Sequence, residues 1–150
     1  MMHAGRRPCG DDHGETLIEL IIAVAIMGIA VVAIVGGFAT SILMSDVHRK
    51  QTTAGAYVRD YAEAVEHYVA VPGNFNATTS PIALQTAVAA DGFAAPTGFT
   101  AGVTSVQCWD DTASVFGTCA TGNTVQRVTL SMASADSRAS ESLVVVVRKP

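Results

Sequence analysis

A single carboxylate, Glu19, stands near the start of an apolar stretch that runs from Leu17 to Phe38 and has no other charged residue. An ionised side chain in hydrocarbon costs at least about 2.5 kcal/mol on insertion scales, so this glutamate is a candidate functional group that needs a partner of opposite charge. The simpler interpretation is that Glu19 marks the start of a membrane helix, because Leu20 to Ala39 alone supplies the roughly 20 apolar residues that a span requires.

Few residues could carry catalysis or bind a metal. Beyond the first fourteen residues the only histidines are His48 and His67, both on a predicted helix, and the chain has no nucleophile elbow, phosphate loop or H-E-x-x-H motif. Asp110 and Asp111 could bind a cation or form an adhesive tip, but two adjacent aspartates fall short of an oxygen cage, and a solvated loop is the simpler interpretation. We therefore expect no enzymatic activity, no metal site and no cofactor.

Composition limits the remaining classes. The chain has 150 residues, of which 49% are hydrophobic, and this allows one small domain with an apolar anchor but no second core. The formal net charge of −4 at pH 7 offers no basic surface for direct nucleic-acid binding. An ordinary secretory signal fits less well, because the apolar stretch exceeds the roughly 7–15 residues of such signals and Ala39-Thr40-Ser41 is a weak cleavage site.

The pattern beyond the apolar stretch predicts an amphipathic continuation of the same helix. Apolar residues recur every three or four positions, while acidic and basic residues occupy the other face. The helix is expected to end near Val71, where Pro72-Gly73-Asn74 is a helix breaker. We therefore assign residues 15–40 to a membrane-spanning helix and residues 41–72 to its amphipathic half. The apolar stripe consists of Ala54, Tyr57, Val58, Tyr61, Ala62, Val65, Tyr68 and Val69.

Residues 73–150 are expected to form an extracytoplasmic head that covers this stripe. Ser80 and Pro81 predict the N-cap and first turn of a short helix over Ile82 to Ala90, which closes near Gly92. Polar residues 134–140 predict a hairpin loop between the last two strands. Strand patterns occur at Val103 to Trp109, weakly at Ser114 to Phe116, in the alternation of residues 127–132, and at Leu143 to Val147, an apolar run typical of a strand covered on both faces.

The expected fold class is therefore α+β, with a long N-terminal α-helix packed on a small antiparallel β-sheet. The helix would consist of a membrane span followed by an amphipathic half, and the sheet would cover the apolar stripe of that half.

The string Gly14-Glu15-Thr16-Leu17-Ile18-Glu19, followed by an apolar helix that contains Gly28, resembles the class III signal of type IV prepilins and pseudopilins. In that family a prepilin peptidase removes a short polar leader after its last glycine, and the new N-terminal residue is usually methylated. The resemblance implies that residues 1–14 are a leader, that cleavage falls between Gly14 and Glu15, and that Glu15 is the methylated residue. It also implies a pilin-like roll for the head.

The resemblance also gives Glu19 a partner. The family's buried carboxylate neutralises the free N-terminal amine of a neighbouring subunit in the filament. Two opposite charges that are each costly to bury alone become tolerable when they are paired in a low dielectric. Glu15 departs from the family, which usually has Phe at that position, and its carboxylate could pair with the amine inside its own subunit.

Small residues along the apolar helix are candidates for close contact between helices. Gly28 belongs to the resemblance, and Ala33, Gly37 and Ser41 follow at a spacing of four. Gly36 stands where many major pilins have a helix-kinking proline. Because glycine is only mildly helix-breaking, at about 1 kcal/mol, the sequence leaves open whether the helix is continuous at Gly36 and Gly37.

Cysteine usage points to an oxidising compartment. Cys9 lies in the implied leader, which leaves Cys108 and Cys119 as an even pair in a segment that the anchor would place beyond the membrane. We expect a disulfide between them. Two unpaired buried thiols are the alternative, and a metal site fits less well, because neither cysteine has a near histidine or a second cysteine at C-x-x-C spacing.

The sequence thus predicts a structural subunit, a minor pilin or pseudopilin, of a type IV pilus or type II secretion-like filament. Expected partners are a prepilin peptidase, other pilin subunits through the N-terminal helix, the pilus assembly platform and the membrane. The precursor is expected to cross the cytoplasmic membrane once, with its head outside, before it enters a cell-surface or periplasmic filament. The alternative is a single-span protein with a small extracytoplasmic binding or adhesive domain that never polymerises.

Overall fold

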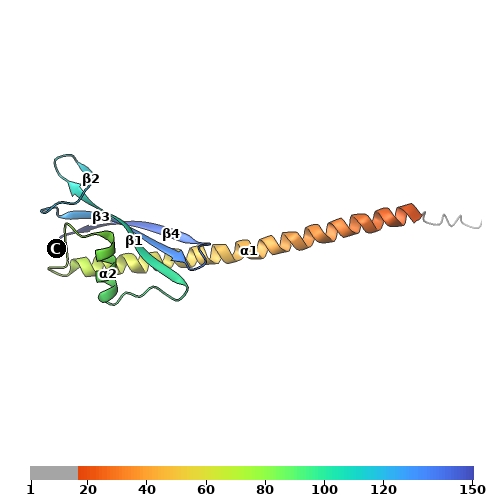
Figure 1. The fold of residues 1–150 in the computed structure, drawn as a ribbon, viewed down its shortest axis with the longest axis horizontal. Coiled ribbons are helices and arrows are strands. Elements are labelled where there is room, and N and C mark those ends of the chain that lie inside the picture. The colour runs from red at the N-terminus through yellow and green to blue at the C-terminus, as the bar shows by residue number, and fades with distance from the viewer. Residues whose placement is uncertain (1–16) are drawn as a thin grey trace, which may run out of the picture. The chain divides into compact units, whose positions relative to one another are not determined.

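The computed structural model describes residues 17–150. The elements follow in the order α1 (Leu17–Ala70), α2 (Pro81–Ala90), β1 (Phe99–Asp110), β2 (Val115–Gly117), β3 (Val125–Ser134) and β4 (Ser140–Arg148) (Figure 1). The chain divides into two compact units, one that ends at Ile42 and one over Leu43–Pro150, and each is described by itself. The expected leader over residues 1–14 lies outside the described residues, as do both sides of the expected cleavage site, Gly14 and Glu15.

The part of α1 in the first unit is apolar around its whole circumference. Its large hydrophobic side chains, from Leu17 to Ile42, are all at least half exposed. α1 is a single helix of 54 residues, so it is continuous through Gly36 and Gly37. The side-chain Oγ1 of Thr40 donates a hydrogen bond to the carbonyl oxygen of Gly36 at 3.1 Å, one turn earlier. A helix that is apolar on every side needs an apolar environment around it.

The second half of α1 supplies one wall of the core in the unit over Leu43–Pro150. The predicted stripe is confirmed, because six of its members are buried and Tyr57 and Tyr68 are partly buried against the same cluster. The ring of Tyr61 stacks on Phe93 at a centroid distance of 4.5 Å, and Tyr57 meets Phe99 edge-on at 5.3 Å. The buried members are Ala54, Val58, Tyr61, Ala62, Val65 and Val69.

The other wall is a four-stranded antiparallel sheet in the order β2-β1-β3-β4 (Figure 1). Alternate residues of β3 face the core, with Val128, Leu130 and Met132 fully buried. A register shift between Val103 and Ser105 interrupts the pairing of β1 with β3. The predicted α+β fold, a long helix packed on an antiparallel sheet, is therefore confirmed.

The short helix α2 begins as predicted. Ser80 is its N-cap, the Ser80 side chain accepts a hydrogen bond from the backbone N–H of Ala83, and Pro81 occupies the first turn. The side-chain amide of Gln85 bonds to the backbone of β1, donating to the oxygen of Ala101 and accepting from the N–H of Val103, both at 3.3 Å. This amide satisfies two backbone groups at the β1 edge, where an unpaired strand would otherwise be open.

Two strand predictions need correction. The run Leu143 to Val147 is not covered on both faces, because β4 is an edge strand whose outward side chains Val144 and Val146 are 53% and 54% exposed. α1 packs on one face of the sheet, and the sequence pattern of a buried strand also suits a strand that is half covered. β1 begins at Phe99 rather than at Val103, because Thr100 to Gly102 pair with β3 although their own strand signal is weak.

Candidate functional site

Glu19 lies in the first turn of α1. The next charged residue along the chain is Asp46, so the intervening helix presents only uncharged side chains. Among residues 17–150 no cation lies within ion-pair distance of Glu19. The partial positive charge of a helix N-terminus favours an acidic residue there, but by about 1 kcal/mol or less at an exposed site. A carboxylate in this position can therefore bind a cation that comes from outside the described chain.

The apolar part of α1 is long and apolar enough to cross a membrane, by length and composition. In the most apolar stretch of 18 residues, no residue is buried within the protein. A span of roughly 20 such residues matches the hydrocarbon thickness of a bilayer. The same surface could instead pack against equivalent helices, since both environments are apolar.

The predicted packing residues fall into two groups. Gly28 and Ala33 line one shallow groove on α1, together with Val24, Ala25, Ile29 and Val32. A Cβ atom added at Gly28 would meet no atom within 4 Å apart from its own neighbours along the helix. Packing within the described chain therefore does not require a glycine at this position. Gly37 and Ser41 are not among the residues that line the groove. The structure thus brings together Gly28 and Ala33 and leaves the other two further along the helix.

The predicted cysteine pair lies at disulfide distance. The Sγ atoms of Cys108 and Cys119 are 2.11 Å apart, and their Cα atoms are 4.8 Å apart. Cys108 is near the end of β1 and is 1% exposed, while Cys119 follows β2. The pair therefore closes the segment that contains β2.

The polar residues considered for catalysis or cation binding have structural roles or are exposed. Asp110 Oδ1 accepts hydrogen bonds from the backbone N–H groups of Thr112 and Ala113 at 2.8 and 3.1 Å. These two bonds lower the pKa of the Asp110 carboxyl, and the bond from Ala113 has the larger effect. His48 is exposed, and His67 Nδ1 lies 3.7 Å from a carboxylate oxygen of Asp91 at the surface. Asp110 therefore caps a turn.

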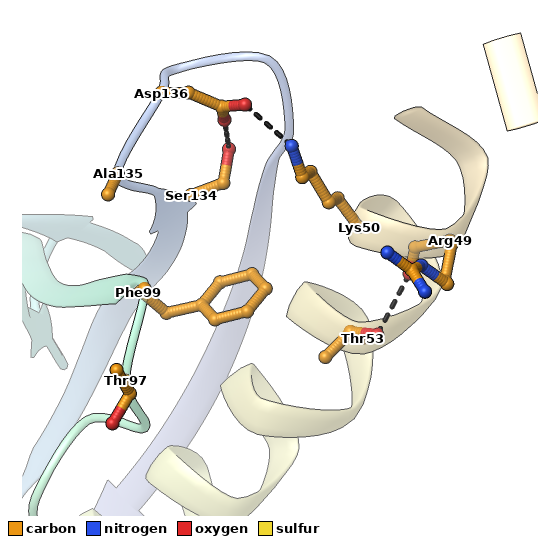
Figure 2. A pocket seen from close by; sticks show the side chains of 9 residues that line it. Arg49, Lys50, Thr53, Thr97, Phe99, Ser134, Ala135 and Asp136 are labelled. Carbon is orange, nitrogen blue, oxygen red and sulfur yellow. Dashed lines mark hydrogen bonds and ion pairs between the residues drawn. The ribbon is translucent and has the colours of Figure 1, made fainter. Parts of the chain in front are cut away.

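An ion-pair cluster that the sequence did not reveal joins α1 to the turn between β3 and β4. Lys50 Nζ lies 2.7 Å from Asp46 on the same helix and 2.6 Å from Asp136 in that turn. Figure 2 shows Lys50 reaching Asp136, whose second oxygen accepts a hydrogen bond from Ser134 at 2.7 Å. Lys50 and then Ser134 hold the pKa of Asp136 well below its usual value, and the two carboxylates raise the pKa of Lys50.

The cluster borders an open pocket of about 560 Å³. Its apolar surface includes Phe99, and Thr53, Thr97 and Ser134 supply hydroxyls (Figure 2). The cations at this pocket already have acidic partners, since Lys50 pairs with two carboxylates and Arg49 with Asp46 at 3.4 Å. The arrangement fastens the β3–β4 turn to α1.

The comparisons with known proteins bear on the helix that holds Glu19. The model of one family, the prokaryotic N-terminal methylation motif, matches residues 10–35. No curated protein and no solved structure matches the chain significantly. The matched range includes Gly14, Glu15, Glu19, Gly28 and Ala33.

Fold and site together define a class of protein, an α+β head on an N-terminal helix that is able to span a membrane. Within that class, the chain carries the type IV pilin-class signal. This motif implies processing by a prepilin peptidase and a membrane-anchored helix, and the proteins that bear it are structural rather than enzymatic. The motif therefore supports a type IV pilin-like or pseudopilin precursor.

Proposed function

We propose that the protein is a minor pilin or pseudopilin, a structural subunit of a type IV pilus or of a type II secretion-like filament. The observation that carries the proposal is the methylation motif over residues 10–35, which includes both Gly14 and Glu19. In this account a prepilin peptidase cleaves the membrane-anchored precursor after Gly14. Glu15 then becomes the first residue and the site of N-methylation.

Glu19 acts in assembly. The α-amino group that cleavage creates carries a positive charge, and a neighbouring subunit brings this charge into an apolar bundle of helices. An unpaired charge in such an environment costs several kcal/mol, and the Glu19 carboxylate removes this cost by pairing with it. The absence of a cation near Glu19 within residues 17–150 is consistent with a partner from another subunit.

The groove at Gly28 and Ala33, with Gly37 and Ser41 further along, allows helices of neighbouring subunits to approach closely. The other partners are the pilus assembly platform and the membrane. The head lies outside the cytoplasm, first at the cytoplasmic membrane and then in a cell-surface or periplasmic filament. An oxidising compartment suits the two cysteines that remain after leader removal, Cys108 and Cys119, as a disulfide-bonded pair.

The test measures the amount of this subunit in sheared filaments relative to the amount in membranes, in the host that makes the filament. Glu19→Gln removes the charge and keeps the shape, so leader removal and membrane level should be unchanged while incorporation falls. Glu63→Gln is the matched control, because Glu63 is exposed on the same helix within the other unit. If Glu19→Gln is processed normally and enters filaments at the unmodified level, the charge-pairing account is wrong.

Glu15 provides a second arm of the same test. Its carboxylate could neutralise part of the same amine, so the double replacement of Glu15 and Glu19 should reduce incorporation further than Glu19→Gln alone. A normally processed chain that never leaves the membrane fraction, even unmodified, would favour the non-polymerising single-span alternative.

A further inference from the structure

β4 is an open edge of the sheet. It has nine residues, its only neighbour in the described sheet is β3, and its register with β3 is regular from end to end. Its apolar run from Leu143 to Val147 contains no proline and no charged residue. Within residues 17–150 no hydrogen bond reaches its outer edge. Folded proteins usually protect such an edge with a charge, a proline, a bulge or a covering segment, because its free backbone groups can pair with another strand.

The hydrogen bond just beyond the end of β4 identifies the residues that face this open edge. The backbone N–H of Lys149 donates to the oxygen of Thr124 at 2.8 Å. In an antiparallel pair every second residue bonds to the partner strand. The odd-numbered residues of β4 therefore bond to β3, and the even-numbered Val144 and Val146 direct their backbone groups outward. The side chains of these two valines are also 53% and 54% exposed.

The opposite edge of the sheet is closed along one part and open along another. The side-chain amide of Gln85 bonds to the backbone of Ala101 and Val103, which covers the first part of β1. The last part of β1 pairs with the three residues of β2. β2 has no strand on its own outer side in the described sheet. The sheet therefore has two open edges, β4 on one side and β2 on the other.

Phe116 of β2 matches the outward valines of β4. The backbone oxygen of Asp110 accepts a hydrogen bond from the N–H of Ser114 at 2.8 Å, so Asp110 directs its backbone toward β2. By the same alternation, Phe116 is the residue of β2 that directs its backbone outward. Its ring lies under the guanidinium of Arg127, whose cross-strand partner is Val146, so Phe116 and Val146 share one face of the sheet.

The directions of the strands select the partner of β4. Successive strands in the order β2-β1-β3-β4 are all antiparallel, so β2 and β4 run in opposite directions. A second copy beside the first in the same orientation therefore presents its β2 to β4 as an antiparallel strand. Two β4 strands could meet only in parallel, which pairs less stably, or with one head turned end over end. A turned head would have its anchor at the wrong end, because α1 enters the head beside the β3–β4 turn, where Lys50 contacts Asp136.

The charges at the two open edges are complementary. Cys108 of β1 and Val147 of β4 pair with the same residue of β3, so they lie at the same height in the sheet. An acidic pair begins two positions after Cys108, and a basic pair follows directly after Val147. All four side chains belong to exposed residues, and none has an ion-pair partner among residues 17–150. The acidic residues are Asp110 and Asp111, and the basic residues are Arg148 and Lys149.

We propose that β4 pairs with β2 of a second copy of this chain in the same orientation, so that the sheets of neighbouring subunits become continuous. The proposal rests on the proposed function, because copies in one membrane or one filament share an orientation. A strand of three residues stabilises such a contact only weakly, and the anchored helices supply the high effective concentration that it needs. A contact between two different edges continues from copy to copy, as a filament requires.

The experiment uses the mature chain in the membranes and filaments of its host. The photoreactive residue p-benzoylphenylalanine replaces Val146 or, as the control, Ile82, which is apolar and 77% exposed on α2. Two copies with different affinity tags are produced together, and mass spectrometry locates the cross-linked peptide. Position 146 should link to residues 110–117 of the other copy, and position 82 should not. A link from position 146 to β4 of the other copy or to a different protein, or no link at all, would overturn the proposal.

Charge exchange tests the same contact. Asp111→Lys and Lys149→Asp should each lower the yield of the cross-link about fivefold, because like charges then meet at the edge. The two changes together should restore the yield. Glu63→Lys, at an exposed position of α1, is the control and should have no effect. Single changes without effect, or a double exchange that does not restore the yield, would contradict the pairing of these two edges.

The N-terminus of the same samples reports on the proposed function separately. A chain that is cleaved after Gly14 and shows no link between β4 and β2 would overturn the sheet pairing and leave the proposed function intact. A chain that starts at Met1 and still shows the link would support the pairing and overturn the proposed function.

Discussion

Removal of both cysteines, Cys108→Ala with Cys119→Ala, should lower the stability of the head by a magnitude set by the closed loop. The two residues are separated by 11 positions, and the enclosed segment carries β2. The chain-entropy model assigns roughly 3 kcal/mol at 25 °C to a loop of this length, mainly because the bond restricts the unfolded chain. For a domain of this size that corresponds to a decrease in Tm of roughly 10 °C.

The folded sheet should survive the change. β2 pairs with β1 at three positions, and Phe116 of β2 also packs edge-on against Trp109 at 5.2 Å and lies 4.5 Å below the Arg127 guanidinium. The strands β1, β3 and β4 pair with each other without the disulfide. The loss should therefore appear as reduced free energy of unfolding and not as a missing core.

The assay is urea unfolding of the mature chain, followed by the fluorescence of Trp109, the single tryptophan. Unmodified protein under a reductant should unfold like the double variant, and the double variant should be insensitive to the reductant. A double variant within about 0.5 kcal/mol of the unmodified protein, or two free thiols in the unmodified mature chain, would refute the reasoning.

Four further substitutions test the core and the ion-pair cluster by urea unfolding. Tyr61→Phe removes a buried hydroxyl that has no hydrogen-bond partner within the described residues, so stability should hold or rise, and a loss above about 1 kcal/mol would contradict this. Leu130→Ala, at 0% exposure, should cost about 2–5 kcal/mol, whereas the half-exposed Val144→Ala should cost under about 1 kcal/mol, and similar costs would contradict the assigned faces. Lys50 depresses the folded-state pKa of Asp136, so the stability lost in Asp136→Asn should be complete at neutral pH and shrink below about pH 4, and a pH-independent loss would contradict the pairing.

The sequence predicts those parts of the fold that depend on local patterns. The stripe that includes Tyr61 and Val65 predicts the buried face of α1, and Pro72-Gly73 predicts its end, which the structure has at Ala70. Ser80 with Pro81 predicts the start of α2, since capping involves only neighbouring residues. Each of these predictions rests on residues within a few positions of each other.

The sequence does not reveal features that depend on contacts between residues far apart in the chain. Lys50 and Asp136 are 86 positions apart, and nothing near either residue indicates that a strand turn comes to lie beside the helix. The same holds for Gln126, whose amide bonds to Asn76 across 50 positions. The run Leu143 to Val147 suits a buried strand, and only the strand order shows that β4 is at the edge.

The candidate site also has a part that the sequence predicts and a part that only the structure reveals. Glu19 stands out in the sequence because a charge is costly within an apolar helix, and the structure adds that no cation within residues 17–150 pairs with it. The spacing of Ala33, Gly37 and Ser41 predicts a face of small residues for contact between helices, and this stays a prediction. The groove on α1 contains Gly28 and Ala33 together with Val24, Ala25, Ile29 and Val32. A groove depends on the sizes of all its neighbours, which a spacing of four does not describe.

The N-terminus of the mature protein tests the central claim most directly. The subunit is purified from the membranes and filaments of its host, and its first residue is determined by N-terminal sequencing or by mass spectrometry of the intact chain. The account predicts a chain that starts at Glu15, because the methylation motif over residues 10–35 includes the bond between Gly14 and Glu15. A chain that starts at Met1, or at any position after Ala39, would contradict the pilin account.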